Sequence, residues 1–246
     1  MSEFEVIIYE KRGHLAYVTL NRPKALNAYN IRMRDELYEV LGAIRDDTEV
    51  RVVILKWAGE KAFCAGADLT EFLSAPPPVL ARSARFERDI WKRFTEMPIP
   101  FIAAMHGYVL GSGIEMSLCC DIRLCSEDAQ FCLPEVALGI IPAAGGSQTL
   151  PRTVGRSHAL DMLLSGRWLK ADEAHRMKLV NRVLPRQQLL IEAEKLAETI
   201  AQFDPAAVMA AKQAVIRGLD MTLADGLRLE QRLGLSLYEN HRMSIT

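Results

Sequence analysis

Two glutamates, Glu115 and Glu135, are the residues of this sequence best suited to do chemistry. They stand twenty positions apart, each in an apolar stretch broken by glycines, residues 107–116 and 131–139. Burying a charged carboxylate is costly. Desolvation, or repulsion between two carboxylates across a cleft, raises the pKa of at least one of them toward neutrality. One could then give a proton while the other takes one, whereas the alternative is two glutamates on solvated helix faces.

Three glycine-rich turns accompany the glutamates, at residues 62–69, 107–115 and 141–148. Glycine permits a tight strand-to-helix turn and a close approach of the backbone to a ligand. Backbone N–H groups at the start of a helix favour negative charge. Two such turns that meet could therefore form an oxyanion hole, which stabilises a carbonyl oxygen as it becomes negative.

Two other uses of a glycine turn fit the sequence less well. Residues 111–116 supply G-x-G, but Met116 occupies the third glycine position and a pyrophosphate would lie beside Glu115. Neither a complete dinucleotide-binding G-x-G-x-x-G nor a G-x-x-x-x-G-K-[ST] phosphate loop is present. Leu110 stands two positions before Ser112, so Ser112 does not sit in the G-x-S-x-G elbow of a serine hydrolase.

The elements that position these turns are expected to alternate between strand and helix. Apolar patterning predicts strands at residues 4–10, 15–20, 50–57, 101–105, 122–125 and 130–133. It predicts helices at residues 31–45, at 82–96 after a proline run at 76–78, from about 113, and almost throughout after 186, with breaks at 204–205 and near 218. The change of pattern predicts an α/β core over residues 1–185 and a helical region over residues 186–246.

Composition places the chain among ordinary globular proteins. It has 246 residues and a net charge of −1, which gives no argument for nucleic acid or an anionic membrane as a partner. No apolar run approaches the roughly 18 residues of a membrane span, and the N-terminus lacks the pattern of a signal peptide. We therefore expect a cytoplasmic protein.

Cysteines and histidines show no metal-ligand spacing. The five cysteines contain no C-x-x-C pair, so we expect buried thiols and no metal site. Cys64, beside a glycine turn, is the one thiol placed to be reactive. His106 precedes another glycine turn, and a structural role at the end of a strand is the expected one.

Ordered motifs through the chain resemble those of a known family. They are LNRPKALNA at residues 20–28, KAFCAGADL at 61–69, AMHGYVLGSGIE at 104–115, CDIR at 120–123, LPE at 133–135, LGIIPAAGGSQTLPR at 138–152, ADEA at 171–174 and LVNRV at 179–183. Together they resemble the enoyl-CoA hydratase/isomerase (crotonase) superfamily over about residues 4–240. The resemblance implies the ClpP/crotonase α/β fold, a spiral of ββα units with a C-terminal helical region used in assembly, and homotrimers or homohexamers.

The resemblance also implies a role for each matching residue. Ala67 and Ser112 match the two positions whose backbone N–H groups hold the acyl-CoA thioester oxygen. Glu115 would activate the water that attacks C3, and Glu135 would supply the proton at C2, although coupled carboxylates titrate jointly. Arg22 and Lys24 would border the CoA nucleotide, or else be solvated surface charges. The residues implied to bind CoA or the acyl group are Lys24, Ala65, Gly66, Asp68, Leu69, Gly111 and Ala143.

The implied function is hydration of the 2,3 double bond of a 2-enoyl-CoA in fatty acid metabolism. Coenzyme A is then part of the substrate, and no metal or redox cofactor is required. Related isomerases and decarboxylases keep the oxyanion hole but commonly lack one carboxylate, so two glutamates favour a hydratase over those alternatives. A non-catalytic RNA-binding relative is a further alternative. That alternative requires a basic surface, but the basic residues here alternate with acidic ones as on a solvated helix. The basic residues are Arg82, Arg85, Arg88, Lys92 and Arg93, and the acidic ones are Glu87, Asp89 and Glu96.

Several positions depart from the family pattern. Ser112 replaces a glycine, and a positive φ there would carry strain. Ala143 replaces a glycine beside the bound water, where its Cβ is expected to crowd the water or the acyl group. Relatives usually continue beyond the position of Thr246 through a helix that covers the site. Trp91 or Phe86, in the helix expected after the proline run, could line the acyl tunnel.

Overall fold

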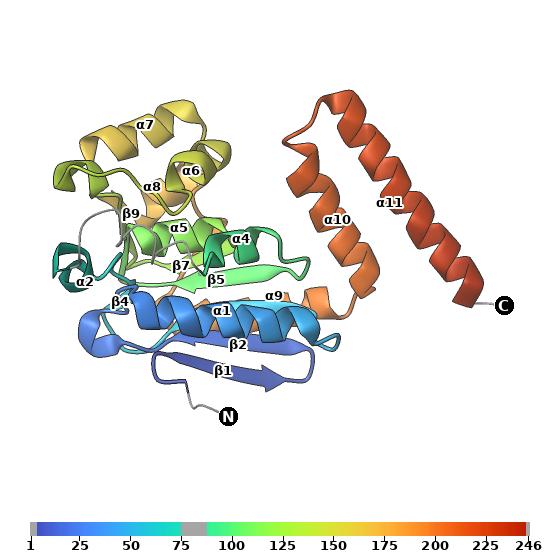
Figure 1. Ribbon diagram of the computed structural model, residues 1–246, viewed down its shortest axis with the longest axis horizontal. Coiled ribbons are helices and arrows are strands. Elements are labelled where there is room, and N and C mark those ends of the chain that lie inside the picture. The colour runs from blue at the N-terminus through green and yellow to red at the C-terminus, as the bar shows by residue number, and fades with distance from the viewer. Residues whose placement is uncertain (1–3, 75–87, 245–246) are drawn as a thin grey trace.

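The strands of the protein form two sheets. The computed structural model describes residues 4–74 and 88–244 (Figure 1). The larger sheet has the order β1-β2-β3-β5-β7-β10 and the smaller has the order β4-β6-β8-β9. The strands are β1 (Ile7–Arg12), β2 (Leu15–Leu20), β3 (Val52–Trp57), β4 (Ala62–Cys64), β5 (Phe101–Met105), β6 (Tyr108–Leu110), β7 (Ile122–Ser126), β8 (Gln130–Cys132), β9 (Leu169–Lys170) and β10 (Arg182–Leu184).

Helices connect and cover these sheets. The α-helices are α1 (Ile31–Asp46), α2 (Leu69–Ser74), α4 (Ile90–Thr95), α5 (Ser112–Leu118), α6 (Gly146–Val154), α7 (Arg156–Ser165), α8 (Ala171–Arg176), α9 (Arg186–Ala201), α10 (Pro205–Gly218) and α11 (Leu223–Ser244). Two short 3-10 helices are η1 (Pro23–Ala25) and η2 (Glu135–Leu138).

The connectivity repeats one unit along the chain. A strand joins the large sheet, the next joins the small sheet, and a helix follows, as in β3-β4-α2, β5-β6-α5 and β7-β8-α6. Successive units place their strands side by side and parallel in both sheets. The spiral of ββα units expected from the sequence is therefore confirmed, and it brings the ends of β4, β6 and β8 together.

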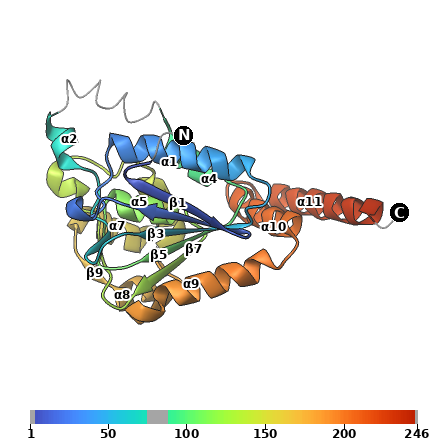
Figure 2. The same ribbon diagram turned by 90° about the horizontal axis from the view of Figure 1, so that it is seen from below.

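The large sheet is buried on both faces, which explains the unbroken apolar run in β3. Val52 and Ile54 pack with the inner face of α9 in one cluster, while Val53 and Leu55 pack in the other cluster, with α1. Figure 2 shows α9 on one side of the sheet and α1 on the other. Strands covered on both faces lose the alternation of apolar and polar residues.

Helix starts follow their capping residues. Asn30 accepts the N–H of Met33 at 2.9 Å at the start of α1, as expected for an asparagine N-cap. Asp204 caps α10, with Pro205 in its first turn, so the predicted break at 204–205 is confirmed. Asp89 caps α4, which starts at Ile90; residues 75–87 of the expected proline connection and helix, including Phe86, lie outside the described residues.

The first strand begins later than predicted. The expected range was residues 4–10, but β1 starts at Ile7 because the N–H groups of Glu5, Val6 and Ile7 donate to the Glu36 carboxylate. The short strands β4, β6 and β9 were not predicted. Each has only two or three residues and is defined by its partners in the small sheet.

The last two helices form an arm that stands away from the body (Figure 1). Lys212 of α10 ties the arm to the core, because its Nζ lies 2.8 Å from Asp121 Oδ2 and donates to Ile99 O at 2.9 Å. Helix α9, in contrast, packs on the sheet, so the structure separates only α10 and α11 from the core. The division into residues 1–185 and 186–246 stays a prediction. Within the described ranges no helix is long and apolar enough to cross a membrane.

Candidate active site

The three glycine-rich turns meet around one cavity of about 90 Å³. The first turn follows β4, the second lies between β6 and α5, and the third precedes α6. The lining residues are Ala65, Gly66, Ala67, Leu69, Gly111, Ser112, Glu115, Pro134, Glu135, Leu138, Ile140, Ile141, Pro142 and Ala143. Nine of the eleven residues predicted for the site thus lie together, the other two being Lys24 and Asp68.

Glu115 is held by the backbone of the third turn. Its side chain is buried in α5, and its Oε1 accepts the N–H groups of Ala144 at 2.8 Å and Gly146 at 3.0 Å. Two backbone donors stabilise the negative carboxylate. Glycine is required at position 146 because a Cβ there would lie 2.9 Å from Glu115 Oε1 and 2.9 Å from Pro142 Cβ.

Glu135 enters the same cavity from η2. It is the first residue of that 3-10 helix and is 9% exposed, compared with 1% for Glu115. Its carboxylate rests against Gly111, where an added Cβ would lie 2.7 Å from Glu135 Oε1. The expectation that both glutamates are buried and face one cleft is confirmed, and the solvated-surface alternative is excluded.

The backbone at Ala67 is turned toward the cavity. Residues 65–68 run parallel to residues 26–29, with a bridge between Tyr29 and Ala67. Tyr29 donates to Gly66 O and accepts from the Asp68 N–H, each at 2.8 Å. In a parallel bridge, consecutive peptide groups of a strand alternate in direction. The Ala67 N–H therefore points away from residues 26–29, and it has no hydrogen-bond partner among the described residues.

A second backbone donor comes from the start of α5. Ser112 is the first residue of this helix, and the first N–H groups of a helix have no partner within it. The two turns touch, because a Cβ on Gly66 would lie 3.3 Å from Leu110 O and 3.8 Å from Gly111 Cα. The donors of Ala67 and Ser112 thus line one cavity, as an oxyanion hole requires.

The expected strain at Ser112 is wrong. The positive φ of this turn falls one residue earlier, at Gly111, with φ of 46° and ψ of −117°. Ser112 is not among the residues with positive φ and adopts the helical start of α5. Glycine therefore remains where the backbone requires it, and the serine replaces a glycine at a position that needs none.

An apolar wall borders the carboxylates. Leu138, Ile140 and Ile141 follow Glu135 in sequence, line the cavity and are exposed, as is Leu69 of α2. The first three were not predicted as site residues, although the apolar run after Glu135 was a visible signal. Ala143 also lines the cavity, and the crowding expected from its Cβ stays a prediction.

The two remaining site residues lie outside the cavity, as does Arg22, which was expected to border the CoA nucleotide. Lys24 is exposed on η1 and borders a separate cavity of about 290 Å³ together with Asn27 and Lys61. Asp68 turns away from the site to form an ion pair with Arg22, at 2.9 Å. The Thr70 hydroxyl and the Arg22 guanidinium lower the pKa of Asp68, although burial acts in the opposite direction. Arg22 is thus an internal partner of the glycine turn.

The other candidate side chains serve the core. His106 is fully buried against the Trp57 ring, with centroids 4.1 Å apart, and burial lowers its pKa to about 4. Burial raises the pKa of the Cys64 thiol to about 11, which makes it unreactive near neutrality. Trp91 packs against Tyr29 and is not among the described residues that line the cavity, so its expected place in an acyl tunnel stays a prediction.

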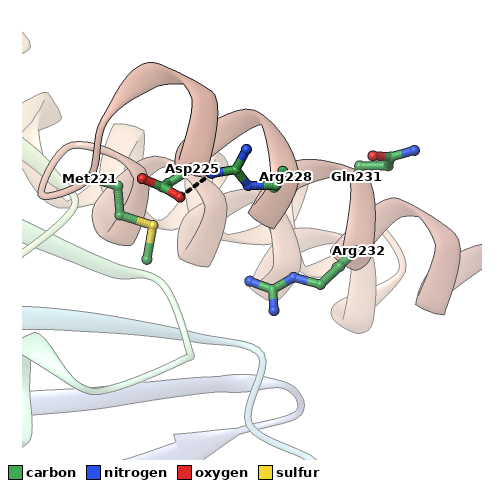
Figure 3. A pocket seen from close by; sticks show the side chains of 5 residues that line it. All are labelled: Met221, Asp225, Arg228, Gln231 and Arg232. Carbon is green, nitrogen blue, oxygen red and sulfur yellow. Dashed lines mark hydrogen bonds and ion pairs between the residues drawn. The ribbon is translucent and has the colours of Figure 1, made fainter.

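A larger cavity, of about 540 Å³, lies where the arm turns from α10 into α11. Its lining comes from α11 and the turn before it (Figure 3): Met221, Asp225, Arg228, Gln231 and Arg232. Asp225 is paired with Arg228 at 2.5 Å, and no second carboxylate or glycine turn is among the described residues that border this space. In the part of the chain that the structure describes, no group of three His, Cys, Asp or Glu side chains could hold a metal ion.

Known proteins are similar to this chain in sequence and in fold. The family model for enoyl-CoA hydratase/isomerase matches residues 10–245. A probable enoyl-CoA hydratase of Rhizobium meliloti (strain 1021) is 44% identical over 235 residues, 96% of this chain and 90% of that protein. A short-chain-enoyl-CoA hydratase of Clostridium acetobutylicum is 41% identical over 228 residues, covering 93% and 87% of the two chains. The crystal structure of an enoyl-CoA hydratase from Bacillus anthracis, 37% identical, superimposes with a TM-score of 0.91 and covers 96% of this chain and 92% of that one.

Proposed function

The chain belongs to the enoyl-CoA hydratase/isomerase family, and we propose that it adds water across the 2,3 double bond of 2-enoyl-CoA thioesters. The observation that carries this proposal is the pair of buried carboxylates, Glu115 and Glu135, facing one cavity that two backbone donors also line. Relatives over nearly the whole chain are named enoyl-CoA hydratases, which supports the same activity.

The thioester carbonyl oxygen would accept the N–H groups of Ala67 and Ser112. Conjugation with the thioester makes C3 electrophilic. The two donors make attack at C3 easier, because they stabilise the negative oxygen of the enolate-like transition state. The same donors would hold C2 and C3 at a fixed position between the carboxylates. No charged side chain is needed at the oxyanion, because the N-terminus of α5 already favours negative charge.

The two proton transfers of the hydration would be divided between the two glutamates. Glu115 would take a proton from water, the hydroxide oxygen would bond to C3, and the electron pair of the double bond would pass to the thioester enolate. Glu135 would then donate its proton to C2. The hydrogen bonds from Ala144 and Gly146 to Glu115 support the base role, because they stabilise its ionised form. Transfer of one proton from Glu115 to Glu135 resets the pair.

The cavity supports a short acyl substrate. Its volume is about 90 Å³, and its wall of Leu138, Ile140 and Ile141 is apolar. A relative named as acting on short-chain enoyl-CoA is 41% identical. Crotonyl-CoA is therefore the first substrate to test. The coenzyme A portion would extend past Ala65 and Leu69 toward Lys24, and no metal or redox cofactor takes part in this chemistry.

We also propose assembly into trimers or hexamers through the arm. Helix α10 has no buried residue, and the arm exposes several large apolar side chains that another subunit would cover: Val215, Leu219, Leu223, Leu227, Leu235 and Tyr238. Assembly into a homotrimer or homohexamer, and a cytoplasmic location, remain predictions of the sequence.

The test is hydration of a panel of 2-enoyl-CoAs with short, long and aryl acyl groups. Loss of the absorbance of the conjugated thioester, with a product heavier by one water, is the expected result, and it should be fastest for a short acyl group. Tight binding of the CoA esters without hydration of any of them would contradict the proposal. It would favour an isomerase or a decarboxylase instead.

A further inference from the structure

Arg22 makes no contact with the cavity, yet it is bonded to the segment that carries an oxyanion donor. Its Nη2 lies 2.9 Å from Asp68 Oδ2, and its Nη1 donates to Ala28 O at 2.5 Å. The side chains of Arg22 and Asp68 are only 19% and 13% exposed. The guanidinium is thus committed to internal partners and is poorly placed to bind a ligand phosphate.

Asp68 is fixed through both of its carboxylate oxygens. While Oδ2 faces Arg22, Oδ1 accepts the N–H of Thr70 at 3.1 Å and its hydroxyl at 2.7 Å. Asp68 directly follows Ala67 in the chain. A shift of the Asp68 side chain would therefore rotate the peptide groups on either side of Ala67, and with them the N–H that faces the cavity.

The segment to which Arg22 binds is itself held in an unusual conformation. Leu26 and Asn27 have φ of 52° and 55°, a region that L residues rarely adopt. Asn27 holds this turn from inside. Its Oδ1 accepts the Arg22 N–H at 2.8 Å, and its Nδ2 donates to Ala58 O and Ala62 O at 3.0 and 2.9 Å. Strained backbone that surrounding contacts hold in place is common at functional sites.

We propose that Arg22 is a positioning residue for the oxyanion hole, acting through Asp68 to fix the direction of the Ala67 N–H. The inference rests on the proposed hydration of enoyl-CoA. Residues 65–68 and 26–29 pair by backbone hydrogen bonds, and the Arg22–Asp68 ion pair locks the open end of that pairing. Because an arginine offers several donors in a fixed plane, it can bridge Asp68 and Ala28 at once, which a lysine cannot reproduce.

The test compares Arg22→Gln, Arg22→Lys and the control Arg186→Gln. Arg186 also bridges two segments, through Glu60 and Asp128, but does not border the cavity. We expect Arg22→Gln to lower kcat for crotonyl-CoA at least about 10-fold, within the loss seen when one oxyanion donor is removed, and to change KM less than about 3-fold. Arg22→Lys should recover part of the loss, and Arg186→Gln should stay near wild type.

A spectroscopic readout separates positioning from simple stability. The carbonyl stretch of bound butyryl-CoA, carrying a ¹³C-labelled thioester carbonyl, should move to lower frequency in the wild type and move less in Arg22→Gln. Butyryl-CoA has no double bond, so this result does not depend on hydration. A wild type that shifts the carbonyl band but hydrates no enoyl-CoA would contradict only the proposed function.

Three results would overturn the inference. One is a wild-type kcat and carbonyl band in Arg22→Gln. Another is a raised KM with unchanged kcat, which would indicate that Arg22 binds the nucleotide. The third is a lowered melting temperature with unchanged kcat and carbonyl band. If Arg22→Gln does not fold, the same measurements of kcat, KM, carbonyl band and melting temperature are made on Asp68→Asn. This variant keeps the size of the side chain and removes the charge facing Arg22.

Discussion

The Oε1 atom of Glu115 accepts the backbone N–H of Ala144 at 2.8 Å across 29 positions of sequence. The proposed base is therefore positioned by the main chain of another turn, together with the N–H of Gly146. A main-chain N–H can change direction only if the backbone moves, so the orientation of the Glu115 carboxylate depends on the backbone conformation of residues 144–146. Changes that alter this conformation should affect catalysis even where they touch no charged side chain.

Gly146→Ala tests this dependence. The added Cβ would lie 2.9 Å from Glu115 Oε1, while the φ of Gly146 is not in the positive range, so the change acts through contact and not through backbone strain. We expect kcat to fall by about 10- to 100-fold, because small displacements of a catalytic group are costly. Gly234→Ala in α11, where a Cβ meets no atom within 4 Å, is the control. A kcat within twofold of wild type in Gly146→Ala would contradict this account.

Lys212→Met should detach the arm from the core. The Lys212 side chain is 10% exposed and bonds to Ile99 O and to Asp121, whose side chain is 22% exposed. Removing one partner of a fully buried ion pair costs about 3–5 kcal/mol, and the loss for this partly buried pair should lie at or below the lower end of that range. We expect a lower urea midpoint and a loss of assembly in sedimentation. Lys195→Met is the control, because Lys195 is exposed and its pair with Glu192 spans 3.8 Å. Equal midpoints for the two variants would show that the Lys212 contact does not hold the arm.

Glu36 should make the stability of the fold depend on acid pH. Burial alone raises the pKa of Glu36, but hydrogen bonds from Arg32 and from the N–H groups of Glu5, Val6 and Ile7 outweigh it and lower the pKa. As pH falls below the unfolded value of about 4.3, the unfolded chain is protonated first. The stabilisation is therefore complete above that value and lost as pH falls through the folded pKa.

The matching experiment is urea unfolding of Glu36→Gln between pH 7 and pH 3. At pH 7 we expect the variant to be less stable by about 1–3 kcal/mol, because hydrogen bonds to a charged acceptor are lost. This difference should shrink below pH 4. The exposed Glu127→Gln should show no such pH-dependent difference. A Glu36→Gln penalty that stays constant down to pH 3 would exclude the proposed role.

The sequence predicted the site well where local pattern determines structure. Glycines and apolar neighbours around Glu115 and Glu135 indicated burial, β2 and β5 have the predicted bounds, and α10 lies between the two predicted breaks. What it missed depends on contacts between distant segments. The hydrogen bonds from the N–H groups of Ala144 and Gly146 to Glu115 span 29 and 31 positions of sequence. The Arg22–Asp68 ion pair spans 46 positions.

The errors have specific physical reasons. A positive φ was expected at Ser112, but a turn can take it up at a neighbouring residue, and Gly111 does so. The short strands β4, β6 and β9 carry too few residues for any periodicity. The motif at residues 61–69 also did not reveal the ion pair of Asp68 with Arg22, and the expected contact of Asp68 with CoA stays a prediction.

The central claim is that two carboxylates share the hydration, and kcat for crotonyl-CoA in Glu115→Gln and Glu135→Gln tests it most directly. Glutamine keeps the shape of the side chain and can accept the same backbone hydrogen bonds, but it neither takes nor gives the proton. We expect kcat to fall at least about 100-fold in each variant, with butyryl-CoA still bound and Glu127→Gln unaffected. If either variant keeps more than about a tenth of the wild-type kcat, the two-carboxylate mechanism is contradicted.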